Sequence, residues 1–132
     1  MRQIVSGLRD HYAKQDLEGR KILVLCNLKP RKLRNVESAG MVLCAKAPDG
    51  ASTVELVDPP EDGSVGDRVT LPGEEGFPPL GAKAVAKQKV WDQVSQEFGT
   101  NEQRVVCYGG NPIVSPSGKP IVAPTLANQA VS

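Results

Sequence analysis

At 132 residues, the chain has room for one domain or two small subdomains. It contains no run of about 18 apolar residues, so we expect no membrane-spanning helix and no membrane partner. With 13 glycines, 11 prolines and only 4% aromatic residues, the composition indicates short strands joined by many turns rather than long helices.

The net charge of +1 hides an uneven distribution along the chain. Residues 1–46 carry ten Lys or Arg against four acids, whereas the remaining residues carry six against eleven. A basic binding face in the first part is therefore compatible with the balanced total. The acidic second part predicts that the rest of the surface does not bind nucleic acid non-specifically, and we expect no DNA specificity.

Two apolar runs, residues 22–26 and 41–45, have the pattern of buried strands. A short basic segment lies between them, and we expect a loop there because Pro30 lacks a backbone N–H and disfavours helix before it. Its four cations are Lys29, Arg31, Lys32 and Arg34. A charge run between strands is most often only a solvated loop. Here two rigid strands would hold the four cations in place, and a polyanion would be a suitable partner for them.

The segment Asn27-Leu28-Lys29-Pro30, followed by Lys32-Leu33-Arg34 and by Ser38 with Gly40 and Met41, resembles one tRNA-binding domain family. That family includes endothelial monocyte-activating polypeptide II and domains appended to methionyl- and tyrosyl-tRNA synthetases. Asn35 stands where the family usually has Gly, and Asn tolerates positive φ better than most residues. Residues 4–8, 59–68 and 89–93 resemble further family segments in the same order, so the resemblance covers nearly the whole chain.

The resemblance implies a mainly β fold, an OB-type barrel followed by a small α+β extension. It begins at the third barrel strand, so we expect a barrel without its first strands, with strand edges left unpaired. We expect the partial OB-fold domain over residues 1–75 and the C-terminal extension, packed on the barrel, over residues 76–132.

The other expected elements follow from local patterns. Strands are predicted over residues 4–8, 53–57, 104–108 and 121–123, and residues 64–69 are expected to lead into a further short strand. Turns are predicted over 47–51, 109–110 and 115–120. A helical turn ending near Gly19 is predicted within residues 10–20, and a Pro/Gly-rich connector over 71–81. One longer helix is predicted over residues 83–98, with Trp91 on its apolar stripe and Gly99 as its C-cap.

No catalytic or metal-binding pattern emerges from the sequence. Cys26, Cys44 and Cys107 are odd in number and form no C-x-x-C pair, so we expect reduced, structural thiols. Together with His11 they do not supply a zinc ligand set. Tyr12 could stack on a base, but an ordinary packing role is the stronger expectation. We therefore expect no cofactor and no enzymatic activity.

The resemblance implies a non-catalytic, cytoplasmic module that binds tRNA by shape and backbone, and delivers or retains it for a methionyl- or tyrosyl-type synthetase. The expected RNA-binding residues are Asn27, Lys29, Arg31, Lys32, Arg34 and Ser38. The cations would neutralise phosphates, while Asn27 and Ser38 would add hydrogen bonds. The alternative role of Ser38 is a turn-capping hydroxyl, but the resemblance favours the RNA contact. The alternative is a protein-docking module of a multi-synthetase complex, with little RNA binding of its own and the helix around Trp91 as its working surface.

Overall fold

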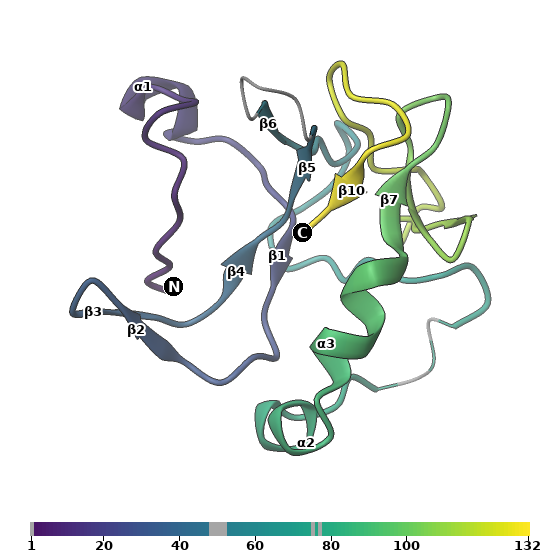
Figure 1. Ribbon diagram of the computed structural model, residues 1–132. Coiled ribbons are helices and arrows are strands. Elements are labelled where there is room, and N and C mark those ends of the chain that lie inside the picture. The colour runs from purple at the N-terminus through teal and green to yellow at the C-terminus, as the bar shows by residue number, and fades with distance from the viewer. Residues whose placement is uncertain (1, 48–52, 75, 77) are drawn as a thin grey trace.

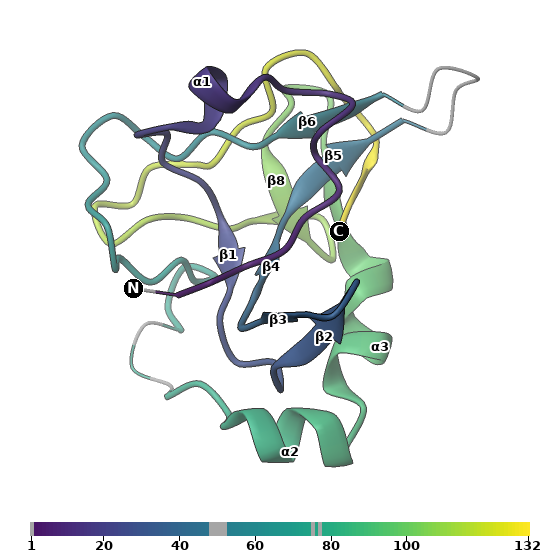
Figure 2. The same ribbon diagram turned by 90° about the vertical axis from the view of Figure 1, so that its left-hand side faces the viewer.

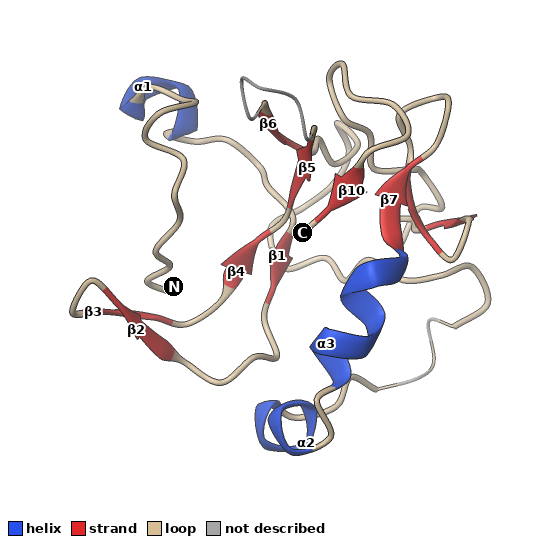
Figure 3. Ribbon diagram, in the orientation of Figure 1, coloured by secondary structure: helices blue, strands red, loops and turns tan. Residues whose placement is uncertain are grey.

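The computed structural model describes residues 2–47, 53–74, 76 and 78–132 of the chain. Within these residues the fold is mainly β, as predicted, with short helical segments beside the strands (Figures 1 and 3). The strands are β1 (Val24–Leu25), β2 (Arg31–Leu33), β3 (Val36–Ser38), β4 (Met41–Val42), β5 (Cys44–Lys46), β6 (Val54–Leu56), β7 (Phe98–Thr100), β8 (Val106–Tyr108), β9 (Asn111–Pro112) and β10 (Ala130–Val131). The helical segments are α1 (Lys14–Leu17), α2 (Ala82–Lys87), α3 (Val90–Val94) and the 3₁₀ turn η1 (Ser95–Glu97).

An antiparallel sheet of six strands, in the order β6-β5-β10-β7-β8-β9, forms the largest element of the described fold. The C-terminal strand β10 lies inside this sheet, where Val131 pairs with Ala45 of β5 and Ala130 pairs with Gly99 of β7. Strands from both halves of the sequence therefore share one hydrogen-bonded sheet. No strand was expected at residues 130–131.

The main hydrophobic core is built from both halves of the chain. It contains Leu43, Ala45 and Val57 from the first half and Val106, Ile113, Ile121, Ala123 and Val131 from the second. Each fully buried Val or Ile side chain contributes about 1.5–3 kcal/mol relative to an exposed one. This shared core fixes the first half of the chain against the second.

A second, smaller cluster attaches the segment around α1 to the sheet. Leu8 packs there with the buried Cys44 and Leu56. The Tyr12 hydroxyl accepts a hydrogen bond from the Leu56 backbone N–H at 2.9 Å, and the Arg20 guanidinium lies 5.3 Å from the centre of the Tyr12 ring. Tyr12 thus has the packing role that was the stronger expectation.

The two apolar runs predicted as strands pair with each other. In β1 and β4, Val24 lies opposite Val42, and Leu25 opposite Met41. The residues between them do not form the expected loop, because β2 and β3 pair as a β-hairpin. Figure 2 shows this hairpin next to β1 and β4, with α2 below it and α3 to its right.

The strand predicted over residues 4–8 is wrong. The chain just before and within this segment runs beside β3. The backbone hydrogen bond there, among the described residues, goes from the Ala39 N–H to the Gln3 carbonyl at 2.8 Å, so it falls outside residues 4–8. The other contacts use side chains: Arg2 Nη1 donates to the Ala39 carbonyl, and Gln3 Nε2 to the Glu37 carbonyl. A strand needs a repeating ladder of backbone bonds, and one bond does not make it.

The single helix predicted over residues 83–98 is also wrong. Lys89 adopts φ 51°, in the left-handed region, and separates α2 from α3. Gly99 is not a C-cap, because residues 98–100 pair with β8 as β7. A Cβ on Gly99 would lie 3.1 Å from the Gln129 carbonyl oxygen, which explains a glycine in this strand. Tertiary pairing has overridden the helical periodicity.

Other local predictions have mixed outcomes. The helical turn α1 ending near Gly19 (φ 74°), the strands β6 and β8, and the turn at Gly109 and Gly110 are confirmed. Residues 64–69 and 121–123 form no strand; around them the structure has only isolated bridges, such as Thr70 with Val114. The predicted turn at 47–51 falls largely on residues 48–52, outside the described residues, and the described part of connector 71–81 holds no helix or strand.

The described strands form separate sheets of two, six and two strands and no closed barrel. No helix in the described part of the chain is long and apolar enough to cross a membrane. The three cysteines are free, and burial raises the pKa of the Cys44 and Cys107 thiols. Cys26 is exposed, which corrects the expectation that it lies inside a buried strand.

Candidate nucleic-acid interface

The β2–β3 hairpin turns through two residues, Arg34 and Asn35, with φ values of 50° and 66°. Positive φ at both central positions is the geometry of the type I′ turn, whose twist matches that of the flanking strands. Asn at the second position fits this conformation, as predicted from its tolerance of positive φ. The local sequence therefore presents a short rigid hairpin rather than a loose basic loop.

The cations Lys29, Arg31, Lys32 and Arg34, here called the hairpin cations, do not form one patch. Side chains alternate along a strand, so Arg31 and Lys32 point to opposite faces of the hairpin. Lys32 lies opposite Glu37 in the neighbouring strand, whereas Arg31 lies opposite Ser38. Positive charge is therefore distributed over both faces and the tip.

None of the hairpin cations has an ion-pair partner among the residues that the structure describes. Other cations of the basic first part are engaged within the chain: Arg20 pairs with Asp58 at 3.0 Å, and the Lys21 ammonium donates to the Gly63 carbonyl. The side chains of the hairpin cations are exposed. They remain available for an external anion, and their charges are not cancelled locally.

Ser38 supports the hairpin from inside. Its side chain is only 3% exposed. The hydroxyl accepts a hydrogen bond from the Val5 backbone N–H at 2.9 Å and donates its own proton to the Gly40 carbonyl at 3.0 Å. Since a serine has one hydroxyl proton, this arrangement leaves none to donate to a phosphate. Here Ser38 has the turn-anchoring role that the sequence analysis gave as its alternative.

Asn27 also makes a contact within the chain. Its side-chain amide donates to the Leu80 carbonyl at 3.1 Å. Leu80 lies two residues before α2, so the bond ties the end of β1 to the start of the helical region. Asn27 thereby helps to set the position of the hairpin relative to α2 and α3.

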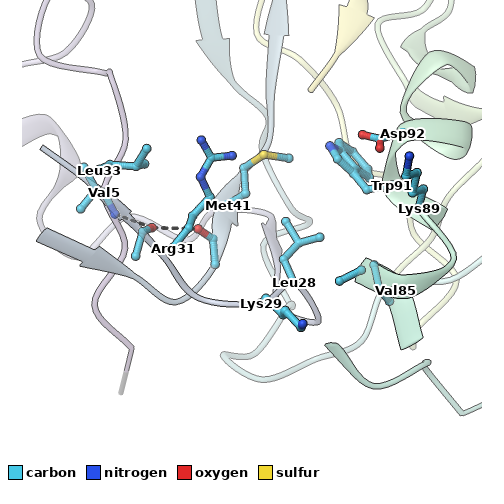
Figure 4. Close-up of a pocket in the computed structure, with 13 residues that line it drawn as sticks. Val5, Leu28, Lys29, Arg31, Leu33, Met41, Val85, Lys89, Trp91 and Asp92 are labelled. Carbon is cyan, nitrogen blue, oxygen red and sulfur yellow. Dashed lines mark hydrogen bonds between the residues drawn. The ribbon is translucent and has the colours of Figure 1, made fainter. Parts of the chain in front are cut away.

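A cleft of about 400 Å³ lies between the hairpin and these helices. Lys29 and Arg31 line it from the hairpin side, and Lys89, Trp91 and Asp92 line it from the helical side. In Figure 4, Trp91, Lys89 and Asp92 lie to the right, Arg31 and Met41 to the left, and Leu28 and Lys29 between them. Lys32 and Arg34 do not line the cleft.

Lys89 was not among the residues expected to bind RNA, and Trp91 was expected on the apolar stripe of a helix. Trp91 does pack against Phe98, with ring centroids 5.9 Å apart, but it also lines the cleft with Lys29 and Arg31. No sequence signal could have joined these residues, because about 60 positions separate the hairpin from α3. Among the described residues, no group of three or more His, Cys, Asp or Glu could hold a metal ion.

Comparisons with known proteins agree on one kind of domain. The family model described as "Putative tRNA binding domain" matches residues 1–68. The chain is 42% identical over 118 residues to the cytoplasmic methionine–tRNA ligase of Arabidopsis thaliana, which covers 89% of this chain and 14% of that protein. It is 37% identical over 131 residues to aminoacyl tRNA synthase complex-interacting multifunctional protein 1 of Mus musculus, which covers 98% of this chain and 40% of that protein.

A solved structure extends the likeness to the three-dimensional fold. The crystal structure of the C-terminal domain of Plasmodium vivax p43 superposes with a TM-score of 0.84 at 28% identity, covering 99% of this chain and 77% of that one. The chain spans less than half the length of the two curated relatives, so it corresponds to one region of each. Because the family model matches more than half of the 132 residues, the chain belongs to the tRNA-binding domain family.

Proposed function

We propose that the chain is a non-catalytic module that binds tRNA through the phosphate backbone and the shape of the folded RNA. The observation that carries the proposal is the state of the hairpin cations. They are exposed, and none has an ion-pair partner among the described residues. They stand in a chain that belongs to the tRNA-binding domain family. Phosphate contacts of this kind give affinity without reading a base sequence.

In this proposal the hairpin cations contact phosphates, and Asn27 and Ser38 hold them in place. Lys32 and Arg31, on opposite faces, would engage phosphates on different parts of the RNA surface, which suits recognition of shape. The Asn27 bond to Leu80 and the Ser38 bonds to Val5 and Gly40 fix the hairpin before RNA arrives. A fixed hairpin loses less conformational entropy on binding than a loose loop.

The proposed task is to deliver or retain tRNA for an aminoacyl-tRNA synthetase of methionyl or tyrosyl type in the cytoplasm. Support comes from the relatives, which are named as a cytoplasmic methionine–tRNA ligase and as a protein that interacts with a synthetase complex. A tethered module raises the effective concentration of tRNA at the synthetase without any catalytic group of its own.

We further propose that the strands up to residue 75 correspond to part of an OB-type barrel, with residues 76–132 as an extension packed on it. The antiparallel pairs β1–β4 and β5–β6 support this assignment. The shared six-stranded sheet supports a close association between the two parts. OB barrels commonly bind oligonucleotides on one strand face and its adjoining loops.

A titration of fluorescently labelled tRNA with the 132-residue chain tests the proposed function. Fluorescence anisotropy is followed at low and at near-physiological salt, with circular dichroism as the check that the chain is folded. We expect saturable binding that weakens steeply as salt increases. A folded chain that does not bind tRNA at low salt would contradict the proposal and would favour the docking-module alternative.

A further inference from the structure

The cleft between the hairpin and the helices has the composition of a nucleotide site. We propose that it takes one unstacked nucleotide of the bound RNA, with the base between the apolar walls and its phosphate beside Lys29, Arg31 and Lys89. This inference rests on the proposed function and adds to it a second kind of contact. The hairpin cations bind the backbone, whereas the cleft holds a single base.

The size and lining of the cleft fit such an occupant. Its volume of about 400 Å³ lies within the range of small-molecule pockets, about 300–1,000 Å³. Apolar surface comes from Leu28 in the segment between β1 and β2, Met41 in β4 and Val85 in α2. Every base has an apolar π-face, so walls of this kind accept a base without selecting its sequence.

Charge favours a phosphate-bearing occupant over an apolar peptide. Lys29 and Arg31 approach from one side and Lys89 from the other, whereas Asp92 is the single acid among the lining residues. None of the three cations has an ion-pair partner within the described residues. All three cations are exposed, so an apolar segment would gain no attraction from them, whereas a nucleotide phosphate would be attracted by all of them.

Trp91 offers both an aromatic surface and an unused donor. Its indole N–H has no hydrogen-bond partner in the described part of the chain, and it is not fully buried. Figure 4 shows the indole nitrogen on the ring edge toward Met41, on the cleft side. A base oxygen or nitrogen acceptor in the cleft would take up this donor in place of solvent.

The backbone at Lys89 places the third cation. Lys89 has φ 51°, a conformation that a residue with a side chain rarely adopts, and it stands at the junction of α2 and α3. Strained backbone of this kind is concentrated at binding sites, where the surrounding structure maintains it. Lys87, two residues earlier on α2, is exposed and does not line the cleft, so it provides a matched control.

Because Trp91 is the only tryptophan, its fluorescence reports directly on the cleft. The full chain is titrated with a single-stranded uridine pentanucleotide, and both tryptophan emission and the anisotropy of a labelled copy are followed. We expect saturable quenching of Trp91. We expect Lys89→Gln to weaken the affinity about fivefold and Lys87→Gln to change it less than about twofold, since both remove one charge but only one lies at the site.

Three results would overturn the nucleotide site: no binding of the pentanucleotide, binding without a change in Trp91 emission, or equal weakening by the two variants. Labelled tRNA is titrated in parallel to separate this inference from the proposed function. Retained tRNA binding with any of those results overturns the cleft site alone. Pentanucleotide quenching without tRNA binding overturns the proposed tRNA function and leaves the cleft site standing.

Discussion

Replacing Lys32 and Arg34 with glutamine removes two hairpin cations that lie outside the cleft, and so isolates the backbone contacts. Each phosphate contact contributes about 0.9 to the slope of log affinity against log salt for a duplex. If all four hairpin cations contact phosphates, the slope is about −3.6 for the unmodified chain and about −1.8 for the double variant. Between 50 and 200 mM salt, the affinity would then fall about 150-fold for the unmodified chain and about 12-fold for the variant.

The assay is anisotropy of labelled tRNA at five or more salt concentrations, with circular dichroism to show that each variant is folded. The control is Lys14→Gln with Lys46→Gln, which removes the same charge from exposed positions on α1 and β5. In Figure 2, α1 and the outer end of β5 lie at the top, away from the hairpin. An unchanged slope in Lys32→Gln/Arg34→Gln, or an equal decrease in the control, would refute phosphate binding by the hairpin.

Three further predictions concern stability and reactivity. Asn35→Val should lower the free energy of unfolding by about 1 kcal/mol or more, because a β-branched residue is strained at φ 66°. Asn35→Gly should leave the stability unchanged or raise it, and urea unfolding measures both variants. Ile121→Val, at a side chain with 0% exposure, should cost about 0.5–1.5 kcal/mol in the same measurement, and no loss would argue against the described core. Ellman's reagent at pH 8 should modify the exposed Cys26 quickly, and Cys44 and Cys107 only after unfolding. Burial raises the pKa of the Cys44 and Cys107 thiols and blocks the access of the reagent, so three equal rates would contradict the fold.

Much of the hairpin region could be predicted from local sequence. The apolar runs around Val24 and Met41 gave β1 and β4, and the tolerance of Asn35 for positive φ is consistent with the turn that forms. The pairing of β2 with β3 was missed because Pro30 and the run of charges are typical of a loop. Arg31 and Lys32 point to opposite faces because side chains alternate along a strand, and this could be inferred only once the pairing of β2 with β3 was known.

The errors arose where distant segments decide local structure. Residues 83–98 keep a helical spacing of apolar positions, yet Phe98 leaves the helix to pair with Tyr108, and Lys89 breaks it. Strand β10 is two residues long and has no alternation to detect, but it is held on both sides by β5 and β7. The cleft is assembled from Arg31 and Trp91, and no local pattern predicts their meeting.

The most direct measurement of the central claim is the amide NMR spectrum of the isotopically labelled chain with and without tRNA. We expect the amide signals of Lys29 and of residues 31–38 to shift or broaden on addition of tRNA. The amide signals of α1 and of Asn111 in β9 should keep their positions and should broaden only as much as the whole spectrum does in a larger complex. Perturbations confined to the six-stranded sheet, or to α1, would place the RNA elsewhere and contradict the assignment of the hairpin as the RNA-binding element.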